Sequence, residues 1–254
     1  MKSILKKAAA GILTAALISA ASGCTLFGGG NEGLNENPLR TFDYGSMKLV
    51  QLEEPREGQK TAVIETDAGT ITAVLYPEYA PNTVQNFINR ANEGYYNGKD
   101  IYCVLEKSIF MSGAFDESRN SGATEDGQPI ANEYTADLWP FKGAVCSFSG
   151  RVGYGDSRFM VMNSRELSEE DFDQLREFRN NNDQALPEEL LTAFREKGVV
   201  IDFAGAYTVF AQTIEGFDVI EKICSANVSG DLSIPDPPIY IKSVTIGEYH
   251  AQEQ

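Results

Sequence analysis

Sulfur-containing and aromatic side chains are concentrated in "KDIYCVLEKSIFMSGAFD", which runs from residue 99 to residue 116. Its uncharged centre carries Cys103, and Phe110 and Met111 follow. The chain has a single histidine, His250, and no cysteines at the spacing of a metal site. A thiolate nucleophile needs a neighbouring base or cation, and zinc needs Cys or His ligands. The residue types therefore favour an apolar binding site over a cysteine nucleophile, a histidine-based triad or a zinc centre.

The first 23 residues have the pattern of a bacterial lipoprotein signal. Lysines precede the uncharged run "AAAGILTAALISAASG", which ends at Cys24. This run is shorter than the roughly 20 apolar residues that a membrane-spanning helix needs. We expect cleavage before Cys24, lipidation of its thiol, and attachment of the exported protein to the outer face of a bacterial membrane by this lipid alone. The alternative is an ordinary signal peptide with an incidental cysteine.

The composition is acidic, with a formal net charge of −16. Nucleic acid is excluded as an expected partner, because binding to phosphates needs a basic surface. The chain that remains after cleavage is long enough for one domain with a sizeable core, and we expect a monomer. A substrate-binding lipoprotein is disfavoured, because the length does not suggest two lobes.

Residues 24–60 are rich in Gly and Asn and lack a hydrophobic period, which predicts a flexible tether. Folded structure is expected over residues 61–247, starting with a hairpin around Asp67. A helix is expected in "PNTVQNFINRANEG", with Asn82 as its N-cap. Many short β-branched runs follow, and they predict a mainly β antiparallel barrel or sandwich.

A highly charged segment, residues 163–200, interrupts this strand pattern and predicts two helices. Ser168 is the expected N-cap of the first. The second is expected to start at Pro187 and to stop at Gly198. The segment is too short to build a core of its own, so we expect a helical insertion packed on one edge of the β domain.

Five segments, in order, resemble the cyclophilin-type peptidyl-prolyl cis-trans isomerases. They are "TDAGTITAVLYPEYAPNTVQNFINRANEGYYNG", "QPIANEY", "KGAVCSFSG", "DSRFMVMN" and "AYTVFAQTIEGFDVIEKI". The resemblance covers about residues 61–247, apart from the insertion. It implies a closed eight-stranded antiparallel barrel capped by two helices, in agreement with the strand pattern.

The resemblance also implies a substrate class and a mechanism. Such proteins bind Xaa-Pro segments and speed rotation about the Xaa-Pro bond, which faces a barrier of about 18–20 kcal/mol from amide resonance. An apolar slot holds the proline ring, and a cationic donor, usually an arginine, disfavours the resonance. No cofactor or metal is expected.

The predicted active site departs from the family pattern, in which the relevant strand resembles Phe-His-Arg-Val-Ile. Here "IYCVL" places Tyr102 at the histidine and Cys103 at the arginine. Phe110 and Met111 match a family Phe-Met pair if two residues are inserted. Without the insertion Met111 takes the place of a family glutamine, and that glutamine is missing in either case.

The resemblance predicts the other wall of the site as well. Its residues are Phe148 where a small residue is usual, Arg158 in place of a glutamine, Met160 in place of a phenylalanine, Tyr207 in place of a histidine, and the family-like Phe159 and Phe203. Together with Tyr102, Cys103, Phe110 and Met111, these are the expected peptide-contact residues.

The sequence allows two interpretations of Arg158. Its guanidinium replaces the lost arginine by reaching the space beside Cys103, or it is a solvated charge while Phe148 and the methionines fill the slot. A hydrogen bond to a charged group contributes about 1.5–3 kcal/mol, so losing the arginine predicts an isomerase about 10–100-fold slower. We expect a weak isomerase or proline-peptide-binding folding factor for exported polypeptides. The alternative is a non-catalytic protein-binding module at the cell surface.

Overall fold

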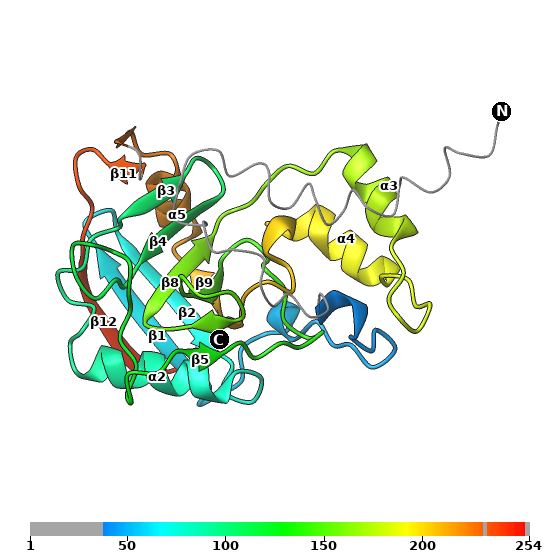
Figure 1. Ribbon diagram of the computed structural model, residues 1–254, viewed down its shortest axis with the longest axis horizontal. Coiled ribbons are helices and arrows are strands. Elements are labelled where there is room, and N and C mark those ends of the chain that lie inside the picture. Colours follow the sequence, from blue (N-terminus) through cyan, green and yellow to red (C-terminus); the bar gives the residue numbers. More distant parts are fainter. Residues whose placement is uncertain (1–37, 231–232, 252–254) are drawn as a thin grey trace.

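The computed structural model describes residues 38–230 and 233–251 (Figure 1). The predicted signal over residues 1–23 and the predicted lipidation site Cys24 lie outside these residues. In the described ranges, no helix is both long and apolar enough to cross a bilayer.

The main element is an eight-stranded antiparallel sheet that curls strongly into a half-barrel (Figure 1). The strands follow the spatial order β12-β1-β2-β9-β6-β8-β4-β3. Their bounds are β1 (Lys60–Thr66), β2 (Thr70–Leu75), β3 (Cys103–Leu105), β4 (Ile109–Ser112), β6 (Ala144–Phe148), β8 (Arg158–Met162), β9 (Val209–Glu215) and β12 (Ile241–Glu248). Two short ribbons pair β5 (Ile130–Ala131) with β7 (Tyr154–Gly155), and β10 (Val228–Ser229) with β11 (Ile234–Pro235).

The predicted closed barrel is corrected to a half-barrel, because the edge strands β3 and β12 are not neighbours in the sheet. The chain before β3 bridges the gap instead. Gly98 N donates to Ile241 O at 2.8 Å, Ile241 N donates to Lys99 O at 2.8 Å, and Ile101 N donates to Ile239 O at 2.8 Å. This segment reaches β12 first and enters β3 only afterwards, so the closure is irregular.

Two helices, α2 (Pro81–Asn92) and α5 (Phe217–Cys224), close the inner face of the half-barrel. α2 is amphipathic, and its apolar side packs into the core that the sheet encloses. The predicted N-cap Asn82 is wrong, because the N-cap is Ala80. The carboxylate of Glu133 performs the capping role by accepting hydrogen bonds from Asn82 N at 3.0 Å and Thr83 N at 2.9 Å.

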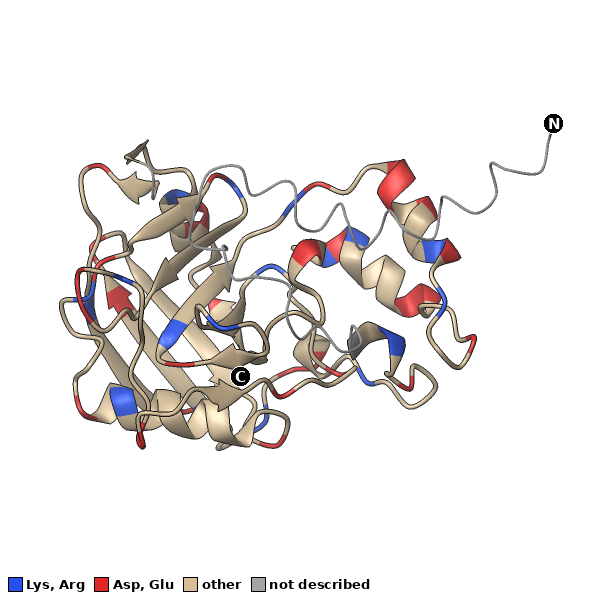
Figure 2. Ribbon diagram, in the orientation of Figure 1, with Lys and Arg blue, Asp and Glu red and all other residues tan. Residues whose placement is uncertain are grey.

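The predicted helical insertion contains α3 (Glu169–Glu177) and α4 (Glu188–Lys197). Ser168 is confirmed as the N-cap of α3, since its Oγ accepts from Asp171 N at 3.1 Å. Pro187 and Gly198 are confirmed as the residues that flank α4. Figure 2 shows acidic residues on both helices, which lie beside the sheet on the right of the view.

The predicted tether is corrected over residues 38–60, because residues 39–49 pack against the insertion and Lys60 already begins β1. Tyr44 and Leu49 are buried in an apolar cluster with Trp139 and the inner sides of α3 and α4. The Tyr44 ring stacks on Trp139 with 6.5 Å between centroids. Spaced aromatic residues, rather than a regular hydrophobic period, anchor this segment. The rest of the predicted tether lies outside the described residues.

Candidate functional site

A row of sulfur-containing side chains crosses four strands on the outer face of the half-barrel. Cys103 on β3 lies opposite Met111 on β4, Met111 lies opposite Met160 on β8, and Met160 lies opposite Cys146 on β6. All four are fully buried in one apolar cluster, which also contains Tyr102. The structure therefore brings together residues that the sequence placed on two separate walls.

Phe110 and Phe159 lie on the opposite, inner face of the sheet. Successive side chains of a strand point to opposite faces, so the neighbours of Met111 and Met160 must turn inward. Phe159 makes an edge contact with Phe87 of α2, with 5.9 Å between ring centroids. The expected peptide contacts of Phe110 and Phe159 are thus replaced by contacts in the inner core, where both support the outer wall from behind.

Phe148 fills the position where the resemblance predicts a small residue. It ends β6 and is only 2% exposed. Its ring centroid lies 6.0 Å from that of Tyr207, which in turn contacts Phe203 at 5.3 Å. Phe203 ends the short 3-10 turn η5 (Ile201–Phe203), so the loop that follows the insertion packs against the end of β6.

Arg158 lies opposite Phe148 in the β6–β8 register and takes part in a buried ion pair. Its Nη2 lies 2.6 Å from Asp156 Oδ2, and its Nε lies 3.0 Å from Oδ1. The side chains of Arg158 and Asp156 are 3% and 8% exposed. Nη1 donates to Arg119 O at 3.1 Å, and the guanidinium carbon lies 5.0 Å from the centroid of the Phe148 ring. The interpretation of Arg158 as a solvated charge is therefore wrong.

Asp156 is the site residue that the sequence analysis missed. A signal was present, because residues two apart on an extended chain lie on the same side, and Asp156 precedes Arg158 by two. The guanidinium of Arg158 has five N–H groups. The Asp156 carboxylate accepts two of them, and the Arg119 carbonyl accepts a third. The pair thus neutralises the charge beside Phe148 and leaves two N–H groups for other acceptors.

Tyr102 is fully buried in the same cluster, and its hydroxyl has no hydrogen-bond partner among the described residues. Burial raises the pKa of Tyr102, so this hydroxyl stays protonated. In the described part of the chain, no three His, Cys, Asp or Glu side chains are grouped to hold a metal ion.

The resemblance implies neighbouring barrel strands for Cys103 and Cys146, and hence a possible bridge, but in the structure β4 and β8 separate them. Three strand spacings of about 4.8 Å place their backbones about 14 Å apart, beyond the roughly 7 Å limit for a disulfide. Cys103, Cys146 and Cys224 form no disulfide in the structure.

The three thiols are expected to resist alkylation in the folded protein. Burial raises the pKa of Cys224 to about 12 and that of Cys146 further, so little thiolate exists at neutral pH. Mass spectrometry after iodoacetamide treatment should find Cys103, Cys146 and Cys224 modified only in denaturant. Modification of any of them in the native protein would contradict this burial.

Comparison with known proteins decides the family. Residues 61–246 match the family described as cyclophilin type peptidyl-prolyl cis-trans isomerase/CLD. The chain belongs to the cyclophilin-type peptidyl-prolyl cis-trans isomerase family. It is accordingly an enzyme of the cyclophilin-type peptidyl-prolyl cis-trans isomerase class, and this family implies proline-containing peptide substrates.

Two staphylococcal relatives, each named "Putative peptidyl-prolyl cis-trans isomerase", are similar over most of their length. That of Staphylococcus saprophyticus is 30% identical over 186 residues, which cover 73% of this chain and 91% of the relative. That of Staphylococcus epidermidis is 26% identical over 199 residues, with 77% and 96% covered. A crystal structure of a Cryptosporidium parvum cyclophilin, solved in the presence of the dipeptide Ala-Pro, shares the fold. It has a TM-score of 0.56 and 17% identity, and 76% of this chain and 99% of that one are covered.

Proposed function

We propose that this cyclophilin-type protein catalyses slow isomerisation of Xaa-Pro bonds in exported polypeptides. The proposed peptide groove is the outer-face region around Phe148, Tyr207 and Phe203, with Tyr102, Cys103, Met111 and Met160 behind it. The observation that carries the proposal is the guanidinium of Arg158, 5.0 Å from the Phe148 ring centroid. Arg158 is the proposed donor in place of the family arginine, because two of its N–H groups are left for a peptide oxygen.

Three features support low activity. Cys103 supplies no charge where the resemblance predicts an arginine. Asp156 neutralises the remaining guanidinium through a buried ion pair. Phe148 occupies the space that a small residue would leave for the peptide backbone. Each feature lowers either the stabilisation of the twisted amide or the share of protein able to bind a peptide.

Titration of the ¹⁵N-labelled protein with acetyl-Ala-Ala-Pro-Ala-amide tests the position of the groove. We expect chemical-shift changes at the amides of Phe148, Arg158 and Tyr207, and much smaller changes with acetyl-Ala-Ala-Ala-Ala-amide. Equal responses to the two peptides, or responses confined to another face, would refute this location.

A second candidate function, non-catalytic binding of protein segments, is favoured by the burial of both Phe148 and Arg158. A groove whose walls pack on one another can hold a partner loop without twisting an amide. Binding of the proline peptide without any acceleration of its isomerisation would support this candidate.

The proposed location is the outer face of a bacterial membrane, with a lipid on Cys24 as the only attachment and a monomeric folded domain. The support is the basic and then uncharged leader that ends at Cys24. Metabolic labelling with radioactive palmitate should mark the wild-type protein and be lost in Cys24→Ser. An unlabelled wild-type protein would exclude the lipid anchor.

A further inference from the structure

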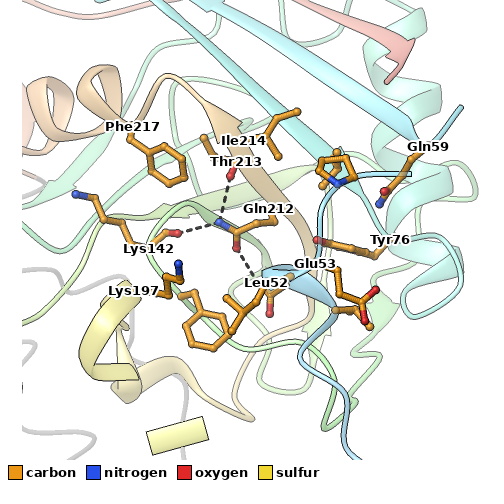
Figure 3. Close-up of a pocket in the computed structure, with 15 residues that line it drawn as sticks. Leu52, Glu53, Gln59, Tyr76, Lys142, Lys197, Gln212, Thr213, Ile214 and Phe217 are labelled. Carbon is orange, nitrogen blue, oxygen red and sulfur yellow. Dashed lines mark hydrogen bonds between the residues drawn. The ribbon is translucent and has the colours of Figure 1, made fainter. Parts of the chain in front are cut away.

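A pocket lies apart from the proposed groove, between residues 50–59 and the strands β2 and β9 (Figure 3). Its volume is about 210 Å³, below the roughly 300–1,000 Å³ of sites for drug-sized ligands. None of the proposed groove residues line it. The pocket therefore has room for a ligand group about the size of one amino-acid residue.

Tyr76 supplies an unused hydrogen-bond donor to this pocket. The residue is only 4% exposed, and its hydroxyl points into the pocket in Figure 3. This hydroxyl has no hydrogen-bond partner among the described residues and is not enclosed by protein, so it is available to a ligand. A ligand oxygen placed in the pocket would satisfy it.

Lys197, at the end of α4, supplies a positive charge. Its ammonium points toward the interior of the pocket, whereas that of Lys142 points away, toward its ion pair with Glu221 (Figure 3). Within the described ranges, Lys197 forms no ion pair. The carboxylate of Glu53 lies on the opposite side of the pocket from Lys197 and can accept an N–H (Figure 3).

The remaining wall is apolar, and the floor is rigid. Leu52, one of the few large apolar side chains left exposed at 40%, lines the pocket together with Ile214 and Phe217. In the floor, Gln51 Nε2 donates to Gln212 Oε1 at 2.8 Å, and Gln212 Nε2 donates to Lys142 O at 2.9 Å. Backbone groups of Trp139 and Lys142 satisfy the rest of the two carboxamides, so ligand recognition is left to the groups around them.

We propose that this pocket binds the C-terminal residue of a polypeptide when that residue is apolar. Lys197 binds the terminal carboxylate, Tyr76 donates to a ligand oxygen, and Glu53 accepts the amide N–H of the residue. The apolar side chain covers Leu52 and packs toward Phe217. The pocket and the proline groove are separate, so this assignment does not depend on the proposed isomerase function.

Isothermal titration calorimetry of the purified protein with N-acetyl-L-leucine and N-acetyl-L-leucinamide tests the role of the carboxylate. We expect the acid to bind about 10-fold more tightly or better, because a hydrogen bond to a charged group is stronger than a neutral one. Lys197→Met should abolish this preference. Lys222→Met, an exposed lysine of α5 outside the pocket, is the matched control and should retain it.

Tyr76→Phe keeps the ring and removes only the hydroxyl, and it should weaken binding of the acid several-fold. Chemical shifts of the Gln51 and Gln212 side-chain amides should respond to the acid and locate the site. The proposal is overturned if N-acetyl-L-leucine and N-acetyl-L-leucinamide bind equally, or if Lys197→Met binds the acid like the wild type. It is also overturned if about 10 mM acid leaves the side-chain amides of Gln51 and Gln212 unperturbed, because a specific site would be occupied at that concentration.

Discussion

Phe148→Ala is expected to raise the rate of catalysed Xaa-Pro exchange by about 10-fold or more. The ring of Phe148 is 2% exposed and is held between Tyr207 and the Arg158 guanidinium. A peptide must displace this ring, and full burial of a Phe side chain contributes about 1.5–3 kcal/mol. Since about 1.4 kcal/mol is a factor of ten in the population able to bind, removing the ring should recover at least that factor.

The rate is measured by exchange NMR on an Xaa-Pro peptide, below the melting temperature of each variant. Phe148→Ala should also lower the free energy of unfolding, because Phe→Ala changes in cores cost about 3–5 kcal/mol. Phe141→Ala is the matched control, since Phe141 is 1% exposed and packs against the insertion instead of the groove. A Phe148→Ala rate no higher than that of the wild type, or an equal gain in Phe141→Ala, would show that the ring does not block the slot.

Asp156→Ala should lower the free energy of unfolding by about 3–5 kcal/mol. The change leaves the Arg158 guanidinium uncompensated at 3% exposure. It also removes the acceptor of the Arg158 backbone N–H, which lies 2.8 Å from Asp156 Oδ1. Desolvation of an unpaired charge is far more costly than the pair itself is stabilising, so the loss falls on the folded state.

Urea denaturation measures this loss. Asp173→Ala is the comparison, because Asp173 pairs with Arg176 on the surface of α3, where the two side chains are 72% and 43% exposed. Exposed pairs of this kind contribute at most about 1 kcal/mol. The double change Asp156→Asn with Arg158→Met removes both charges and should restore most of the stability. Equal losses for Asp156→Ala and Asp173→Ala would contradict the assignment of a buried ion pair.

Features set by neighbouring residues could be predicted from the sequence. The ends of α3 and α4 at Ser168, Pro187 and Gly198 were correct, because capping acts within one helical turn. The start of α2 was not, because its cap is the Glu133 carboxylate, about 50 residues away along the chain. Closure of the sheet failed as a prediction for the same reason, since it depends on hydrogen bonds between residues 98–101 and 239–241.

In the site, too, features set by nearby residues could be predicted, and features set by distant residues could not. The resemblance predicted the residues of the outer row, Cys103, Met111 and Met160, from their order in the sequence. It could not assign the face of Phe110 or Phe159, because a strand's register decides which neighbour turns outward. The burial of Arg158 also depends on Phe148 and on the loop that holds Arg119, which are distant in sequence.

We propose that this family member is a slow isomerase whose remaining donor is Arg158. Exchange NMR on an Xaa-Pro peptide with the wild-type protein and the Asp156→Asn, Arg158→Met double variant tests it most directly. We expect the wild type to accelerate exchange, about 10–100-fold less than a relative with an arginine at the position of Cys103, and we expect no acceleration by the folded double variant. No acceleration by the wild type, or equal acceleration by the double variant, would contradict it.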